Sequence, residues 1–204
     1  MLDERKLKQI EKNVPIMINE GEISRDESNK KLVKFFLENA LLSLNTTKIL
    51  NEISFKSDVK KRFGFIDDNF EAYLWVINTS YYSMFYMAGA LLASISIKIK
   101  SEIGIHKKTF ETLVYYFYLN KRIAKHYLDE FEEAQTECQE LLGREEPIAL
   151  MQRKAKELIL KYDSEMEKRS TFTYEMGQKT KSTKAITSLE RAAEFYNECL
   201  KILN

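Results

Sequence analysis

The chain has 204 residues, and its 32 basic and 31 acidic side chains leave a formal net charge of +1. This balance excludes attraction of nucleic acid or membranes by the field of the whole protein, so such contacts need a local patch. Cys138 and Cys199 are too few and too far apart for a disulfide framework, which predicts a reduced, cytoplasmic protein. With two prolines and six glycines, the composition predicts an all-α fold.

The first 25 residues form an N-terminal extension, with a weakly amphipathic helix over residues 1–12 that ends near Pro15. A long helix is predicted from about Asp26 to Ile53, because apolar residues recur on one helical face. That face, predicted to point to the core, consists of Leu32, Phe35, Phe36, Ala40, Leu41, Leu44, Thr47 and Leu50.

A polar loop is predicted over residues 56–69, and its last residues, Asp67, Asp68 and Asn69, are candidate caps for the next helix. From Glu71 to Lys98 no side chain between the two ends is ionised. A helix that is apolar nearly all round must be enclosed by protein or by lipid.

Two readings of this central segment are open, a membrane span and a buried central helix. Asn78, Ser80 and a group of tyrosines lie at its middle, whereas membrane spans carry their aromatic residues at the ends. The segment is therefore predicted to be a buried helix. Because buried serine and tyrosine hydroxyls need hydrogen-bond partners, one side should face a subunit interface or a site.

The second half of the chain predicts four more helices. A break at residues 101–104 precedes a helix that starts at Ile105, and a charge-rich helix follows over residues 121–142. Pro147 is placed to open a long helix to about Met176. After a polar loop at residues 178–181, the last helix runs to Leu203. Its predicted buried face consists of Ile186, Leu189, Ala193, Tyr196, Leu200 and Leu203.

Several kinds of site lack their motifs, because the chain has no glycine-rich phosphate loop, no zinc-ligand spacing and no nucleophile elbow. No metal or other cofactor is therefore expected. The segment from Glu167 to Glu175 stands out because it holds few apolar residues, and it includes Lys168, Arg169 and Tyr174. An ordinary solvated helix surface is one interpretation, since Glu165 and Arg169 are spaced as an i,i+4 ion pair.

Four segments, in order, resemble the HEPN family. Tyr81-Tyr82-Ser83-Met84-Phe85 followed by Ala88 and Ala90-Leu91-Leu92 is similar to that family's second core helix. His106-Lys107 is similar to the start of its third helix, and Arg169 with Tyr174 resembles an R-x4-Y form of its R-x4-6-H motif. Ala192, Ala193 and Phe195 fit the last helix, so the resemblance covers about residues 26–203.

The resemblance implies an up-and-down bundle of four to five core helices over residues 26–204, with a longer segment at residues 120–147. It also implies a homodimer with the arginine motif in a cleft between subunits. Active members are metal-independent endoribonucleases, some of them toxins paired with a minimal nucleotidyltransferase antitoxin, while others are binding modules without activity.

The chemistry of Tyr174 favours the binding modules. Cleavage by a ribose hydroxyl needs a base that is half-deprotonated near neutral pH. Histidine, with a reference pKa of about 6.5, meets this need, and tyrosine, with one of about 10, does not. Arg169 would bind the phosphate, with Tyr174 or His106 as the remaining catalytic candidates. A core or capping role is the alternative for His106.

Binding candidates lie in two regions of the predicted fold. On the central helix they are Asn78, Ser80 and Tyr81. Near the start of the last helix, basic side chains gather at one end of the predicted bundle. These side chains either bind phosphate or form a solvated surface. These are Lys168, Arg169, Lys179, Lys181 and Lys184. The prediction is a dimeric module that binds RNA or a nucleotide, with an endoribonuclease or a structural partner protein as alternatives.

Overall fold

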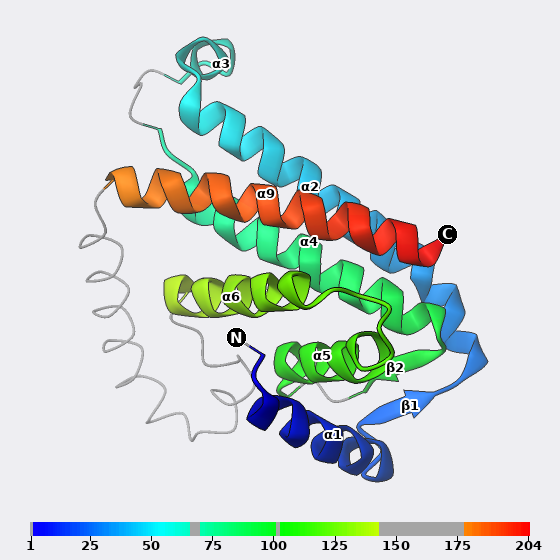
Figure 1. Ribbon diagram of the computed structural model, residues 1–204. Helices are drawn as coiled ribbons and strands as arrows, with labels where there is room; N and C mark the ends of the chain where they lie inside the picture. The colour runs from blue at the N-terminus through cyan, green and yellow to red at the C-terminus, as the bar shows by residue number, and fades with distance from the viewer. Residues whose placement is uncertain (1, 66–69, 101–102, 143–177) are drawn as a thin grey trace, which may run out of the picture.

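A computed structural model describes residues 2–65, 70–100, 103–142 and 178–204 of the chain (Figure 1). Within these ranges the protein is an all-α helical bundle, which confirms the predicted fold class. The elements in chain order are α1 (Glu4–Asn19), β1 (Ile23–Arg25), the 3-10 helix η1 (Glu27–Lys31), α2 (Leu32–Phe55), α3 (Ser57–Arg62), α4 (Tyr73–Ser94), β2 (Ile97–Ile99), α5 (Ile105–Leu113), the π-helix η2 (Val114–Tyr118), α6 (Lys125–Leu142) and α9 (Gln178–Leu203).

Helix α4 lies at the centre of the bundle and packs closely against α2, which runs antiparallel to it (Figure 1). The Ser83 hydroxyl of α4 donates a hydrogen bond to the Ala40 carbonyl of α2 at 3.0 Å. Six residues further along α4, a Cβ on Gly89 would lie 2.9 Å from the Phe36 ring, so only glycine admits this close approach. The small and hydroxyl side chains of α4 therefore decide how near α2 can lie.

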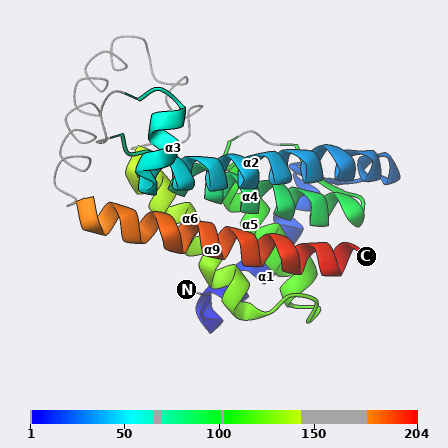
Figure 2. The same ribbon diagram turned by 90° about the horizontal axis from the view of Figure 1, so that it is seen from above.

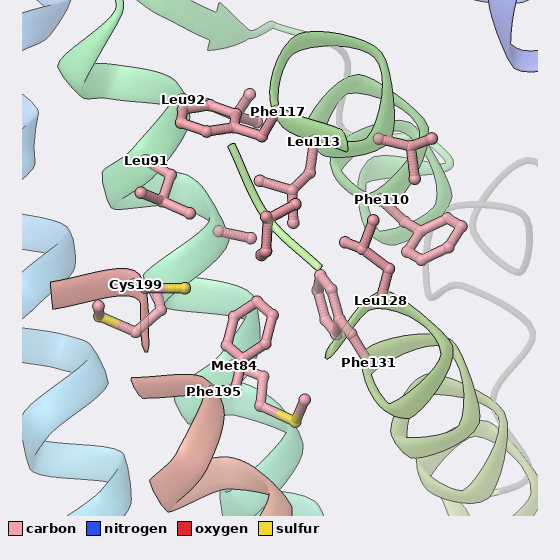
Figure 3. Packing of buried hydrophobic residues seen from close by; sticks show 14 of the residues in the cluster. Met84, Leu91, Leu92, Phe110, Leu113, Phe117, Leu128, Phe131, Phe195 and Cys199 are labelled. Atoms are coloured by element: carbon pink, nitrogen blue, oxygen red, sulfur yellow. The ribbon is translucent and has the colours of Figure 1, made fainter. Parts of the chain in front are cut away.

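Helices α6 and α9 complete the bundle, so that α2, α4, α6 and α9 alternate in direction (Figures 1 and 2). Ala185 at the start of α9 packs with Tyr73 and Val76 at the start of α4. Between α6 and α9, the rings of Phe131 and Phe195 lie 5.4 Å apart. Figure 3 shows side chains of α4, α6 and α9 meeting in one core, together with those of α5 and η2.

The N-terminal segment is part of this core, because α1 buries Ile10, Val14 and Met17 in the main apolar cluster. The predicted end of the first helix near Pro15 is wrong, since α1 continues through this proline to Asn19. Proline in a helix interior removes one backbone hydrogen bond and costs about 3 kcal/mol. Burial of Val14 and Met17 on either side of it offsets that cost.

The central helix ends earlier than its uncharged sequence predicts, at Ser94 instead of near Lys98. Ser96 takes a left-handed conformation with φ of 69°, which breaks the helix. Ile97–Ile99 then forms a strand that pairs antiparallel with Ile23–Arg25. Apolar content alone does not distinguish a last helical turn from a short buried strand.

Residues 56–69 were predicted to be a loop, but Ser57–Arg62 forms the short helix α3, in which Val59 is buried. The candidate caps at residues 67–69 lie outside the described residues. Ala72 precedes α4, and its N–H donates to the Ser54 hydroxyl of α2 at 2.8 Å. A serine from a neighbouring helix thus satisfies a backbone donor at the start of the central helix.

Two predicted helix starts are also corrected. Helix α9 begins at Gln178, so the predicted polar loop at residues 178–181 is its first turn. Helix α6 begins at Lys125 instead of residue 121, because Lys121 has a positive φ of 57°. The predicted helix from Pro147 to Met176 lies outside the described residues.

The buried faces of two helices differ from those predicted. In α9 the predicted face is displaced by one residue, since Ile186 is exposed and the buried positions are Ala185, Ser188, Ala192, Phe195 and Cys199. In α2, Ala40 and Leu44 are buried as predicted, while Phe35 and Leu41 are exposed. Among the described residues, no helix has the length and apolar content needed to cross a membrane.

Candidate functional site

The candidate site is the contact between the middle of α4 and the start of α5. Gly104 adopts the left-handed conformation, with φ of 71°, directly before α5, and this turn places His106 in the first turn of the helix. There the Nδ1 atom of His106 lies 2.7 Å from the hydroxyl oxygen of Tyr81. The structure therefore brings together two of the predicted site residues, twenty-five positions apart in the sequence.

Aromatic rings surround this pair. The His106 ring centroid lies 4.6 Å from that of Phe85 and 6.1 Å from that of Tyr82, whose ring is presented edge-on. Behind Tyr81 lies Phe131 of α6, at a centroid distance of 5.9 Å. These neighbours fix the half-buried imidazole in one orientation.

The Tyr81–His106 hydrogen bond has a definite chemical capacity. A neutral imidazole with an unprotonated Nδ1 accepts a hydrogen bond from the tyrosine hydroxyl, whereas a protonated Nδ1 donates one to the phenolic oxygen. Either arrangement holds the ring and fixes the proton on one nitrogen. The pair can therefore orient a histidine for hydrogen bonding to a ligand, or serve only to join α4 to α5.

The other two candidates on α4 have separate surroundings. The thiol of the buried Cys138 on α6 donates to the Asn78 Oδ1 atom at 3.3 Å. Ser80 is completely buried, and its hydroxyl has no hydrogen-bond partner within the described part of the chain. Neither Asn78 nor Ser80 hydrogen-bonds to the Tyr81–His106 pair, so the structure does not join the three into one site.

The basic candidates are only partly described. Lys168, Arg169 and Tyr174 lie outside the described residues. Lys179 belongs to the first turn of α9, and the side chain of Lys181 is half-buried. The start of α9, which carries Lys179 and Lys181, lies at the end of the bundle where α4 also begins (Figure 1).

Acidic side chains of α6 face Lys184 and Arg191 of α9 across the seam between the two helices. The ammonium group of Lys184 lies 3.5 Å from a Glu137 carboxylate oxygen. Further along the seam, Arg191 pairs with Glu133 at 3.0 Å and with Glu137 at 3.6 Å. Lys184 is thus partly neutralised within the protein, which reduces the predicted basic crowding.

The same seam contains Glu130, which the sequence did not single out. One of its carboxylate oxygens is buried without a hydrogen-bond partner among the described residues. Burial raises the pKa of Glu130, and the neighbouring charge of Glu194 raises it further. In the described ranges, no three His, Cys, Asp or Glu side chains are grouped so as to hold a metal ion.

Sequence reasoning missed Phe131 and Cys138 as neighbours of the candidate residues. Both occupy apolar positions of an amphipathic helix, and such positions read only as core. Comparisons with protein-family models, with curated proteins and with solved structures give no match. The function is therefore inferred from the residues of the chain itself.

Proposed function

We propose that this protein is a HEPN-type helical module that acts as a homodimer and binds RNA or a nucleotide in a cleft between subunits. The observation that carries the proposal is the meeting of segments in which the resemblance lies. Tyr81 of α4 contacts His106 of α5, and Phe131 packs between Tyr81 and Phe195 of α9. Residues that are distant in the sequence thus surround one point of the bundle.

Weak or absent catalysis is part of the proposal. Tyr174 replaces the histidine of the nuclease motif, and its ordinary pKa near 10 suits it poorly to act as a base at neutral pH. His106 already bonds to Tyr81 and packs on Phe85, which supports a positioning role. Arg169 is then a phosphate-binding residue whose guanidinium can form two parallel hydrogen bonds.

Binding is tested with a short single-stranded RNA and, separately, with ATP, over a series of salt concentrations. Alanine at Lys179, Lys181 and Lys184 is expected to weaken RNA retention. It should also lower the slope of log affinity against log salt by about 0.7 for each lost phosphate contact. The matched control carries alanine at Lys8, Lys12 and Lys98, which are exposed on other elements. Equal losses in both triple variants would contradict a specific basic site.

Cleavage is tested in EDTA with a mixed-sequence RNA. We expect no cleavage that Arg169→Ala abolishes. Arg169-dependent cleavage would instead favour the second candidate, a metal-independent endoribonuclease that acts as a toxin with a nucleotidyltransferase antitoxin. The 2.7 Å contact at His106 Nδ1 is the observation that keeps this candidate open, and loss of cleavage in His106→Ala would support it. If neither binding nor cleavage occurs, a structural partner protein remains.

A further inference from the structure

Helix α2 is apolar on two opposite faces, and the described part of the chain covers only one of them. The inner face packs on α4 through Ala40 and Leu44. On the opposite face, Phe35, Leu42 and Ile49 are 53%, 65% and 52% exposed. In Figures 1 and 2, α2 lies at the edge of the bundle. We call these three residues the outer stripe.

The outer stripe has a regular spacing. Its residues are seven positions apart, so they fall on one line along the helix and extend over about 21 Å at 1.5 Å per residue. A helix at the edge of a bundle usually carries charge on its outward side. The outer stripe instead presents a phenylalanine, a leucine and an isoleucine, the kind of surface that helix partners cover.

Polar residues border the outer stripe, and one of them, Glu38, is charged. Asn39 and Thr46 lie on one side of the stripe and Glu38 on the other, where its carboxylate lies 3.8 Å from the ammonium group of Lys34 in the same helix. The Asn39 side-chain amide already donates to the Phe35 carbonyl of its own helix, at 2.8 Å. Covering the face would therefore not leave this donor unsatisfied.

We propose that a second copy of this chain packs antiparallel on the outer stripe, about a twofold axis at Leu42. Leu42 then meets its own copy, and Phe35 meets Ile49 of the second copy, because the two lie at equal distances on either side of the axis. A twofold contact of this kind requires one surface to complement itself. Three apolar residues with equal spacing satisfy that requirement.

The charges beside the stripe favour the antiparallel direction. Lys34 and Glu52 lie on the same flank of α2, at nearly equal distances from Leu42. In the antiparallel pair, each Lys34 comes opposite Glu52 of the other copy, so that unlike charges meet across the contact. Both side chains are at least half exposed. Each already pairs within its own helix, Lys34 with Glu38 at 3.8 Å and Glu52 with Lys56 at 2.7 Å, and such exposed pairs are weak enough to exchange partners.

This inference rests on the homodimer of the proposed function and names its contact surface. A different protein seated on the same stripe, such as an antitoxin, is the competing occupant. The two are distinguished by the mass of the purified chain alone. Because that measurement contains no RNA, its failure is distinguishable from failure of the RNA-binding proposal.

Light scattering coupled to size exclusion is expected to give a dimer for the natural chain. Leu42→Glu places two like charges at the axis and should raise the dimer dissociation constant by about 100-fold or more. Because Leu42 is exposed, the variant should keep the circular dichroism spectrum of the natural chain. Ile186→Glu, at an exposed isoleucine of α9, is the control and should leave the dimer intact.

Two further variants test the register. Leu42→Cys should form a covalent dimer on mild oxidation and Ile186→Cys should not, since Cys138 and Cys199 are buried and contribute no background. Lys34→Glu and Glu52→Lys should each weaken the dimer, and the double variant should restore it. A natural chain that stays monomeric at all concentrations overturns the proposal, as does a dimer that Leu42→Glu leaves unchanged.

Discussion

Helices α4 and α2 are alike in length and apolar content but have different surroundings. Both are long, both are rich in apolar residues, and neither shows a strongly one-sided pattern. The side chains of α4 are mostly buried by α2, α5, α6 and α9, whereas α2 has one covered face and one exposed face. The comparison teaches that apolar content predicts a need for cover, and that the cover can come from the same chain or from another.

A leucine-to-alanine substitution in each helix should give the largest difference between them in the loss of unfolding free energy. Leu91→Ala in α4 removes a side chain that is 0% exposed, and should lower the free energy of unfolding by about 3 kcal/mol. Leu42→Ala in α2 should change it by less than about 0.5 kcal/mol in the monomer. Urea unfolding measures both changes, at a protein concentration too low for the dimer to form. Equal losses would contradict the different enclosure of the two helices.

Removing the hydrogen bond that joins α2 to the start of α4 should lower the free energy of unfolding by a smaller amount. The Ser54 hydroxyl accepts from the Ala72 N–H and donates to the Leu50 carbonyl. Ser54→Ala leaves the Ala72 donor buried and unpaired, and should cost about 1 kcal/mol. Ser43→Ala in the same helix is the control for the intrinsic gain of alanine, because among the described residues its hydroxyl makes no hydrogen bond between helices. If urea unfolding shows both variants to be equally stable, the Ser54 hydroxyl does not stabilise the start of α4.

The smallest change in stability is expected at a partly buried carboxylate on α6. Burial, followed by the charge of Glu194, raises the pKa of Glu130 in the folded protein. The folded state therefore binds a proton more readily than the unfolded state, so this group lowers stability as pH rises through the raised pKa. Glu130→Gln should stabilise the protein by a few tenths of a kcal/mol at pH 7 and by nothing near pH 4.

Thermal unfolding of Glu130→Gln at both pH values checks this sign. Glu140→Gln, at an exposed position of the same helix, should change the melting temperature at neither pH. A gain at pH 4 as large as that at pH 7 would show that the carboxylate charge is not the cause.

The sequence predicted which segments are helical more successfully than it predicted their faces. The long segments of α2 and α4 were found because each is rich in apolar residues over five or more turns, a length that indicates a helix and exceeds that of most strands. The buried face of α9 was placed one residue away, since Ala185 and Ser188 carry little hydrophobic signal and Ile186 carries much. Small residues are buried where helices approach closely, and that approach depends on the partner helix.

The short elements were not predicted, for a different reason. The strand at Ile97–Ile99 exists because Ile23–Arg25 lies beside it, and no local pattern contains that information. For the candidate site, the sequence proposed Tyr81 and His106 separately, and only the fold shows that they share a hydrogen bond. Their role toward a ligand stays a prediction.

The burial of α1 has a consequence for any shortened form of the chain. A version starting at Asp26 would keep the helices that resemble the HEPN family, yet it would lose the wall that Ile10, Val14 and Met17 provide. Phe110 and Phe117 belong to the same cluster and would meet solvent. Such a fragment should aggregate at concentrations where the natural chain stays dispersed, although every residue that carries the family likeness would still be present.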